Sequence, residues 1–161
     1  KHYPSFSLVF LAVSVTLLAH QATARVGGIH DLCRNTDYQQ LCREVIRGAN
    51  KPSRATENAI LSLITETNKA TVLASKFGQN QYIDACKGLY SDAIDSLKTS
   101  LDSLKTKDKG TLNSNLSAAL TYYGTCDDTY AEAGQNSPLA ATNKHLAQMA
   151  DNSLALASLI Q

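Results

Sequence analysis

The four cysteines of this 161-residue chain are the residues whose chemistry their spacing constrains most closely. Thiolates either bind a metal or join in disulfides, and structural metal sites use Cys-x₂₋₄-Cys pairs or Cys/His clusters. Wider intervals separate the cysteines here, at Cys33, Cys42, Cys86 and Cys126. The spacing therefore predicts no metal site and favours two disulfides, for which four cysteines allow three connectivities.

Residues that could support catalysis are few. A nucleophile–His–acid arrangement needs a histidine, and the only histidines after residue 24 are His30 and His145. We interpret His145 as a surface residue of a helix, and His30 has no stronger claim. No glutamate has a histidine three residues later, as di-metal helical bundles require, and no Gly-rich phosphate loop occurs. The sequence predicts neither an enzyme nor a cofactor.

Composition narrows the class of protein. The 15 basic and 14 acidic residues give a net charge of +1, which disfavours a nucleic-acid surface. Hydrophobic residues make up 43% and charged residues 18%, as in ordinary globular chains. Only 8 glycines and 3 prolines occur, too few for a many-turned β-sandwich. We expect one helical domain.

The first 24 residues have the layout of a secretory signal peptide. Lys1 and His2 precede an apolar run, Leu8–Ala19, which the small-residue pattern Ala22-Thr23-Ala24 follows. As a helix this run would span only about 18 Å, against roughly 30 Å for a membrane core. We expect cleavage after Ala24, secretion into an oxidising compartment, and no membrane attachment afterwards. The sequence does not begin with Met, so we expect residues to precede Lys1.

The remainder shows apolar residues at three- and four-residue spacing, which predicts helices. Two short pieces, each with one cysteine, should form a helical hairpin, Ile29–Asn35 and Asp37–Ile46. Four long helices are expected at about Ala55–Phe77, Gln81–Lys105, Thr111–Ala133 and Pro138–Ile160. Ser137 should cap the last of these, with Pro138 in its first turn. Each long helix carries one apolar stripe, so an all-α, up-down-up-down four-helix bundle is predicted at 54–161, after the hairpin and its connection at 25–53.

The expected helices also favour one connectivity of the cysteines. Cys33 and Cys42 meet when the short hairpin closes. Cys86 and Cys126 lie on the apolar stripes of two successive antiparallel helices, about one turn apart in stagger. We therefore predict the pairs Cys33–Cys42 and Cys86–Cys126.

Several motifs, in order and with the right cysteine placement, resemble the plant invertase/pectin methylesterase inhibitor family. Thr36-x-Tyr38-x-x-x-Cys42 is similar to its hairpin motif, and Cys86-x-x-x-Tyr90-x-x-Ala93 to its most recognisable stretch. Ser117-Ala118-Ala119-Leu120 followed by Thr125-Cys126-Asp127-Asp128 resembles a third segment. Ser137-Pro138-Leu139 and the Ala/Leu-rich end resemble the last helix. The similarity covers essentially residues 29–161.

The resemblance implies a secreted plant inhibitor of the apoplast or cell wall, monomeric when free, that binds one enzyme molecule. That enzyme is either pectin methylesterase or acid invertase of the cell wall or vacuole. The best-understood invertase inhibitors of the family carry Pro-Lys-Phe at the turn into the third long helix, where this chain has Lys109-Gly110-Thr111. This departure favours pectin methylesterase, with its pectin-binding cleft blocked.

Polar residues outside the apolar stripes are candidates for the target-binding face. The candidates are Thr65, Glu66, Asn68 and Lys69 on the first long helix and Asp84, Lys87, Ser91, Asp95 and Lys98 on the second. Alternating charges at helical spacing also suit plain solvent exposure, so both interpretations stay open. The Asp127-Asp128 pair is interpreted as a solvated helix face.

Two further points stay open. Asn115-Leu116-Ser117 is an N-glycosylation sequon, but the apolar stripe beside Asn115 could hinder access. A small secreted lipid-binding protein is a remote alternative. It is disfavoured because a chain that resembled the plant lipid-transfer proteins would have their eight-cysteine framework, and this chain has four cysteines.

Overall fold

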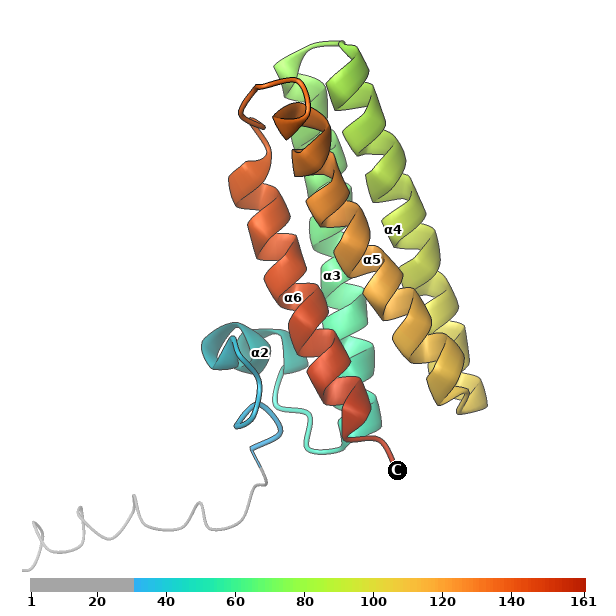
Figure 1. Cartoon of the computed structure of the whole chain (residues 1–161). Coiled ribbons are helices and arrows are strands. Elements are labelled where there is room, and N and C mark those ends of the chain that lie inside the picture. Colours follow the sequence, from blue (N-terminus) through green and yellow to red (C-terminus); the bar gives the residue numbers. More distant parts are fainter. Residues whose placement is uncertain (1–30) are drawn as a thin grey trace, which may run out of the picture. The chain divides into compact units, whose positions relative to one another are not determined.

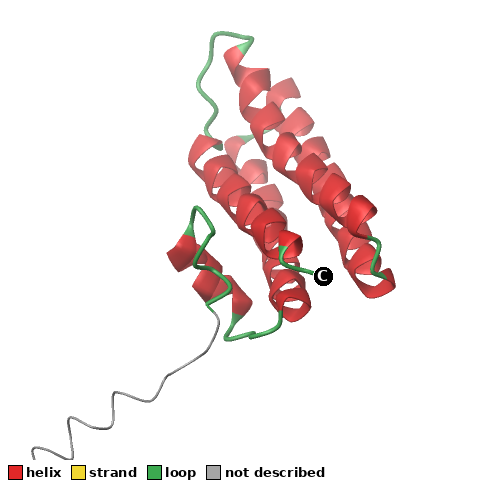
Figure 2. Cartoon of the chain, turned by 60° about the horizontal axis from the view of Figure 1, so that its bottom comes forward, coloured by secondary structure: helices red, strands yellow, loops and turns green. Residues whose placement is uncertain are grey.

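The computed structural model describes residues 31–161, which form helices and connecting turns with no strand (Figure 1 and Figure 2). The helices of this range are α2 (Gln39–Ile46), α3 (Pro52–Ala74), the 3₁₀ turn η1 (Ser75–Phe77), α4 (Gln81–Thr106), α5 (Lys109–Ala131) and α6 (Ala140–Ser158). The predicted all-α class is confirmed. The expected signal peptide, residues 1–24, and His30 lie outside the described residues.

The four long helices form an up-down-up-down bundle (Figure 1). Each packs against the next along the chain, and α3 also packs against α6, which closes the ring around one core. Short connections at 78–80 and 107–108 force antiparallel neighbours. The short helix α2 packs against α3 and α6 at one end of the bundle.

Side-chain caps fix the starts of two helices. The Asn80 side-chain oxygen accepts hydrogen bonds from the backbone N–H groups of Tyr82 and Ile83, both at 3.0 Å, at the start of α4. Asp108 accepts the N–H of Thr111 at 3.0 Å, and its contacts with Thr111 hold the pKa of Asp108 below its usual value. Because this cap begins α5 directly after the turn, the break expected at 107–110 is only 107–108, and Gly110 lies inside α5.

Two further predictions for the long helices were wrong, one for a boundary and one for burial. α6 begins at Ala140, because Ser137 caps a separate turn by accepting the N–H of Leu139 at 3.1 Å. Phe77 was expected on the buried stripe of α3 but is 44% exposed. The helix tightens to a 3₁₀ turn at Ser75, and the smaller number of residues per turn rotates Phe77 off the stripe.

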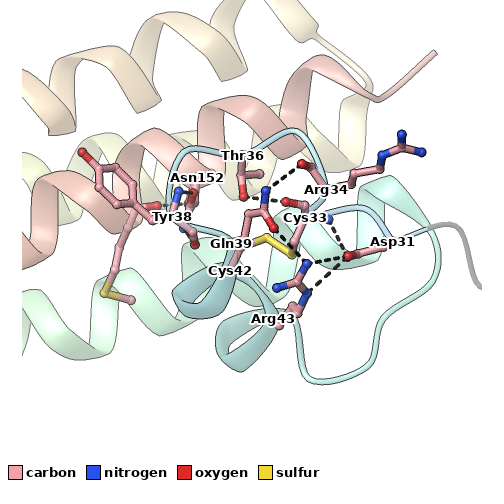
Figure 3. The surroundings of a disulfide bond; sticks show 11 residues. Asp31, Cys33, Arg34, Thr36, Tyr38, Gln39, Cys42, Arg43 and Asn152 are labelled. Carbon is pink, nitrogen blue, oxygen red and sulfur yellow. Dashed lines mark hydrogen bonds and ion pairs between the residues drawn. A yellow bond between two sulfur atoms is a disulfide. The ribbon is translucent and has the colours of Figure 1, made fainter.

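The N-terminal segment, residues 31–46, also differs from the expected pair of helices. Residues 32–35 form turns, since Asp31 accepts the N–H of Cys33 at 3.1 Å and the Thr36 hydroxyl donates to the Cys33 carbonyl at 2.9 Å. Such local bonds compete with helical ones. The segment is stapled by the Cys33–Cys42 disulfide, and Arg43 pairs with Asp31 at 2.7 Å, which lowers the pKa of Asp31 (Figure 3).

A second disulfide, Cys86–Cys126, joins α4 to α5 inside the core, where both cysteines are fully buried. The two pairs are those that the helix positions predict. Polar contacts accompany this bridge. Tyr90 of α4 donates to the Asn143 side-chain oxygen of α6, and the Asn143 amide donates to Asp127 of α5 at 2.6 Å. Burial and the nearby Asp127 raise the pKa of Tyr90. We call Tyr90, Asn143 and Asp127 the core polar chain.

The two disulfides should differ in what their removal costs. Cys86–Cys126 closes a loop of 40 residues and Cys33–Cys42 one of 9. In the chain-entropy model these loops correspond to about 4 and about 2.5 kcal/mol. We expect the Cys86→Ala/Cys126→Ala variant to lose more unfolding free energy in urea than Cys33→Ala/Cys42→Ala. Equal losses would contradict the loop-length argument.

Candidate target-binding surface

The outer side of α3 carries a shallow, largely apolar hollow of about 580 Å³. It is lined by Thr65, Asn68, Lys69, Val72, Leu73 and Lys76. Three of the sequence candidates on α3 therefore lie together, since Thr65, Asn68 and Lys69 share this hollow and are exposed. Thr65 and Asn68 also donate to carbonyl groups one turn earlier, at 2.9 and 2.8 Å, which fixes their side-chain orientation.

Sequence reasoning missed two residues of this hollow, Val72 and Lys76. Val72 is 64% exposed, the largest exposure of any big apolar side chain in the described residues. The signal was present in the sequence, because the apolar stripe of α3 runs through Ile60 and Leu63 and leaves Leu61 and Val72 on the opposite side. Protein contact sites commonly have an apolar centre within a polar rim, and the largely apolar hollow around Val72 fits that arrangement.

The fourth candidate on α3, Glu66, lies toward α6. It is half-buried, pairs with Lys69 at 2.7 Å, and lines a hollow of about 430 Å³ between α3 and α6. Exposed His145 borders this hollow and also a separate one between α2 and α6. His145 is thus a surface residue, as expected.

The candidates on α4 form an outward stripe and do not enter the α3 hollow. Asp84, Ser91, Asp95 and Lys98 are exposed, whereas Lys87 is half-buried. Asp95 and Lys98 pair with each other at 3.0 Å along the helix. The structure therefore groups three of the four α3 candidates at one hollow and spreads the α4 candidates along an adjacent helix.

One polar pair was misinterpreted from the sequence. Asp127 does not lie on a solvated face, because it is half-buried and accepts the amide of buried Asn143. Asp128 is exposed, as expected. The difference arises because Asn143 is contributed by another helix, and one sequence pattern does not reveal a partner across helices.

Asn115, the candidate glycosylation residue, lies within α5 and is half-buried. Its side-chain nitrogen, the atom that would carry a glycan, donates to the Thr111 carbonyl at 2.9 Å. In the folded bundle this nitrogen is therefore occupied by a helical backbone group.

Neither a metal cluster nor a membrane helix is found in residues 31–161. No three side chains of His, Cys, Asp or Glu in this range gather to hold an ion. None of the helices in the described part of the chain has the length and apolar character needed to cross a bilayer.

Comparison with known proteins gives the chain's relatives. A family model described as plant invertase/pectin methylesterase inhibitor matches residues 28–156. "Pectinesterase inhibitor 12" of Arabidopsis thaliana is 37% identical over 86 residues, covering 50% of this chain and 49% of that protein. A protein named "Putative invertase inhibitor" from Platanus orientalis is 37% identical over 81 residues, covering 50% and 48%. The chain thus spans about half the length of the curated relatives it matches.

Solved structures show the same fold. Mutant form A of a pectin methylesterase inhibitor from Arabidopsis superposes with a TM-score of 0.70, covering 83% of this chain and 97% of that one at 15% identity. A second such inhibitor from Arabidopsis thaliana gives 0.64, covering 85% and 98%, also at 15% identity. At this identity the structures establish the helical bundle alone. Since the family model matches most of its length, the chain belongs to the plant invertase/pectin methylesterase inhibitor family, a family of inhibitors rather than enzymes.

Proposed function

We propose that this chain is a secreted plant inhibitor that binds pectin methylesterase one-to-one and blocks its pectin-binding cleft. The observation that carries the choice of target is Lys109-Gly110-Thr111, at the position where the best-understood invertase inhibitors have Pro-Lys-Phe. Acid invertase is the second candidate, because the relatives are named both ways.

The position of this tripeptide supports its use in target choice. It forms the first turn of α5 at one end of the bundle, where Lys109 and Gly110 are exposed. Pro-Lys-Phe would present a rigid proline and an aromatic ring to a partner. This chain presents the ammonium group of Lys109, the backbone of Gly110 and the hydroxyl of Thr111. The absence of an aromatic anchor disfavours tight binding at this point.

Titration of both enzymes tests the proposal. We expect the oxidised protein, residues 25–161, to abolish plant pectin methylesterase activity near one molar equivalent at about pH 6. Acid invertase under the same conditions should keep its activity. Loss of invertase activity alone would reverse the assignment of target, and no effect on either enzyme would refute the inhibitor function while leaving the family and fold intact.

A variant with Lys109→Pro, Gly110→Lys and Thr111→Phe provides the matched comparison. The Asp108 backbone, at φ −83° and ψ 89°, lies outside the helical region that a following proline disfavours, and proline is tolerated in the first turn of a helix. A Cβ atom at position 110 would meet only the Asp108 carboxylate, at an ordinary 3.6 Å. The variant should fold like the native chain. It should inhibit acid invertase more strongly than the native protein does.

We further propose that the α3 hollow is the centre of the target-binding face, with the α4 stripe at its margin. The hollow supplies an exposed apolar side chain, Val72, beside the amide of Asn68 and the ammonium of Lys76. Interfaces commonly place apolar contacts at the centre and charged groups at the rim. On this proposal, Asp84, Lys87, Ser91, Asp95 and Lys98 contribute less to affinity than the α3 residues.

Substitution of Val72 tests this surface. Because Val72 is exposed, Val72→Glu should fold normally yet weaken inhibition of the esterase at least about tenfold, by placing a charge at the centre of the contact. Thr125→Glu, on the exposed side of α5, is the matched control and should leave inhibition unchanged. Equal affinity of the Val72→Glu and native proteins would exclude the hollow as the contact centre.

Secretion is part of the same proposal. The layout of residues 1–24 is that of a signal peptide, and two disulfides suit an oxidising compartment. Passage through the secretory pathway also brings the Asn115 sequon to the enzymes that attach N-glycans.

We expect protein secreted from plant cells to carry no glycan at Asn115, because α5 orders this residue and engages its amide nitrogen. Intact-mass spectrometry should show the mass of the bare chain cleaved after Ala24. The Pro138→Thr variant places a threonine two residues after Asn136, which completes a sequon in an exposed turn. This variant should gain a glycan, which verifies that the host modifies this protein. A glycan at Asn115 of the native chain would contradict the expectation.

A further inference from the structure

The N-terminal segment is held against α6 by a reciprocal contact between Tyr38 and Asn152 (Figure 3). The Tyr38 backbone N–H donates to the Asn152 side-chain oxygen at 3.3 Å, and the Asn152 amide donates to the Tyr38 carbonyl at 2.9 Å. Asn152 is fully buried, so these bonds replace the water that its amide would otherwise need. The only other polar tie to the bundle in the described contacts is from Asn58 of α3 to the Ile46 carbonyl, at 2.8 Å.

This contact brings two like charges together. Asp37 immediately precedes Tyr38 and Asp151 immediately precedes Asn152, so both aspartates flank this contact, and the charge of Asp37 acts on Asp151. Asp37 is exposed and Asp151 is half-buried. Within residues 31–161 neither carboxylate takes part in an ion pair.

Other charges around the junction do not neutralise this pair. On the N-terminal segment, Arg43 pairs with Asp31 and the charge of Arg34 also acts on Asp31, while Glu44 is acidic; no cation lowers the pKa of Asp151. All four charged residues of α3 form ion pairs along that helix, Arg54 with Glu57 and Lys69 with Glu66. On α5 no charged residue occurs at 110–126, and on α6 the nearest are Lys144 and His145, both exposed and about two turns away.

We propose that protonation of Asp151 strengthens the docking of the N-terminal segment on α6, so that the segment is held more firmly in acid than at neutral pH. This inference concerns the fold of residues 31–161 and does not depend on which enzyme is inhibited. Undocking would expose Asn152 and bring the buried Cys33–Cys42 disulfide to solvent.

The direction of the effect follows from the same geometry. Burial, together with the negative charge of Asp37, raises the pKa of Asp151 above its ordinary value. The contribution of Asp37 exists only while the segment is docked, so Asp151 binds its proton more tightly in the docked form than in the undocked one. The docked form therefore gains stability as the pH falls through that raised pKa and loses this gain as the pH rises.

Hydrogen exchange of the Tyr38 amide measures this docking directly, because Asn152 accepts that N–H only in the docked form. The experiment compares protection factors, which are corrected for intrinsic exchange, between about pH 4 and 7.5. The amide of Tyr123 in the core serves as the reference. Because this charge pair is partly exposed, the effect should be modest. We expect the protection factor of the Tyr38 amide, relative to that of Tyr123, to fall about two- to fivefold as the pH rises from about 4 to 7.5.

Charge-neutral variants decide the cause. Asp151→Asn should hold the acid-level protection at all pH values, and Asp37→Asn should reduce the pH dependence. Asp92→Asn, on the exposed side of α4, is the matched control and should behave like the native chain. A pH-independent native protein, or an Asp151→Asn variant with native pH dependence, would overturn the proposal. If Asp151→Asn fails to fold, the Asp37→Asn variant tests the proposal instead, because Asp37 is exposed and its substitution should not disturb the fold. Native pH dependence in Asp37→Asn would then overturn the proposal.

Discussion

The buried contact among α4, α5 and α6 is the constraint on which the bundle depends. The Cys86–Cys126 bridge fixes the position of α4 along α5, and the core polar chain then ties α6 to both. Apolar stripes define which side of each helix is buried but distinguish less sharply between neighbouring registers. A buried amide and hydroxyl distinguish them more sharply, because each loses its hydrogen bond when the register changes and is left desolvated without a partner. A second polar contact, between the Thr67 hydroxyl and the Tyr123 hydroxyl at 2.7 Å, sets α3 against α5 in the same way.

Because buried contacts hold the bundle together, the residues on its surface can change while the fold is kept. The bundle superposes on a pectin methylesterase inhibitor at only 15% identity, so the architecture tolerates replacement of most side chains. What remains free to change is the outer side of the helices, where Val72 and the first turn of α5 lie. Function in such a scaffold resides in these surface groups rather than in the fold. On our proposal, a single tripeptide at the start of α5 bears on the choice between the two targets for which relatives in this family are named.

The N-terminal segment follows a different physical logic from the bundle. It contributes few long-range contacts, and its docking depends on one disulfide, a few buried apolar residues and the Tyr38–Asn152 contact. Elements with few tertiary contacts open at lower free energy than a core does. We therefore expect a modest electrostatic change at this junction to alter how often the segment opens.

The sequence by itself determined the helical class, the number of long helices and the two disulfide pairs, because helical periodicity and capping are local and the cysteines lie on predictable faces. It also identified Thr65, Asn68 and Lys69 as exposed polar residues. Tertiary structure alone decided that these three residues share a hollow with Val72. It likewise decided that Asn143 donates a hydrogen bond to Asp127, and that Asn152 is hydrogen-bonded to the backbone of Tyr38. It also decided that residues 32–35 are turns, where side-chain bonds to the backbone outcompete a helix. The physical reason is that a stripe of apolar residues reports which side of a helix is buried. The partner of a polar group, in contrast, belongs to another helix whose rotation and register are fixed only when the whole core is packed.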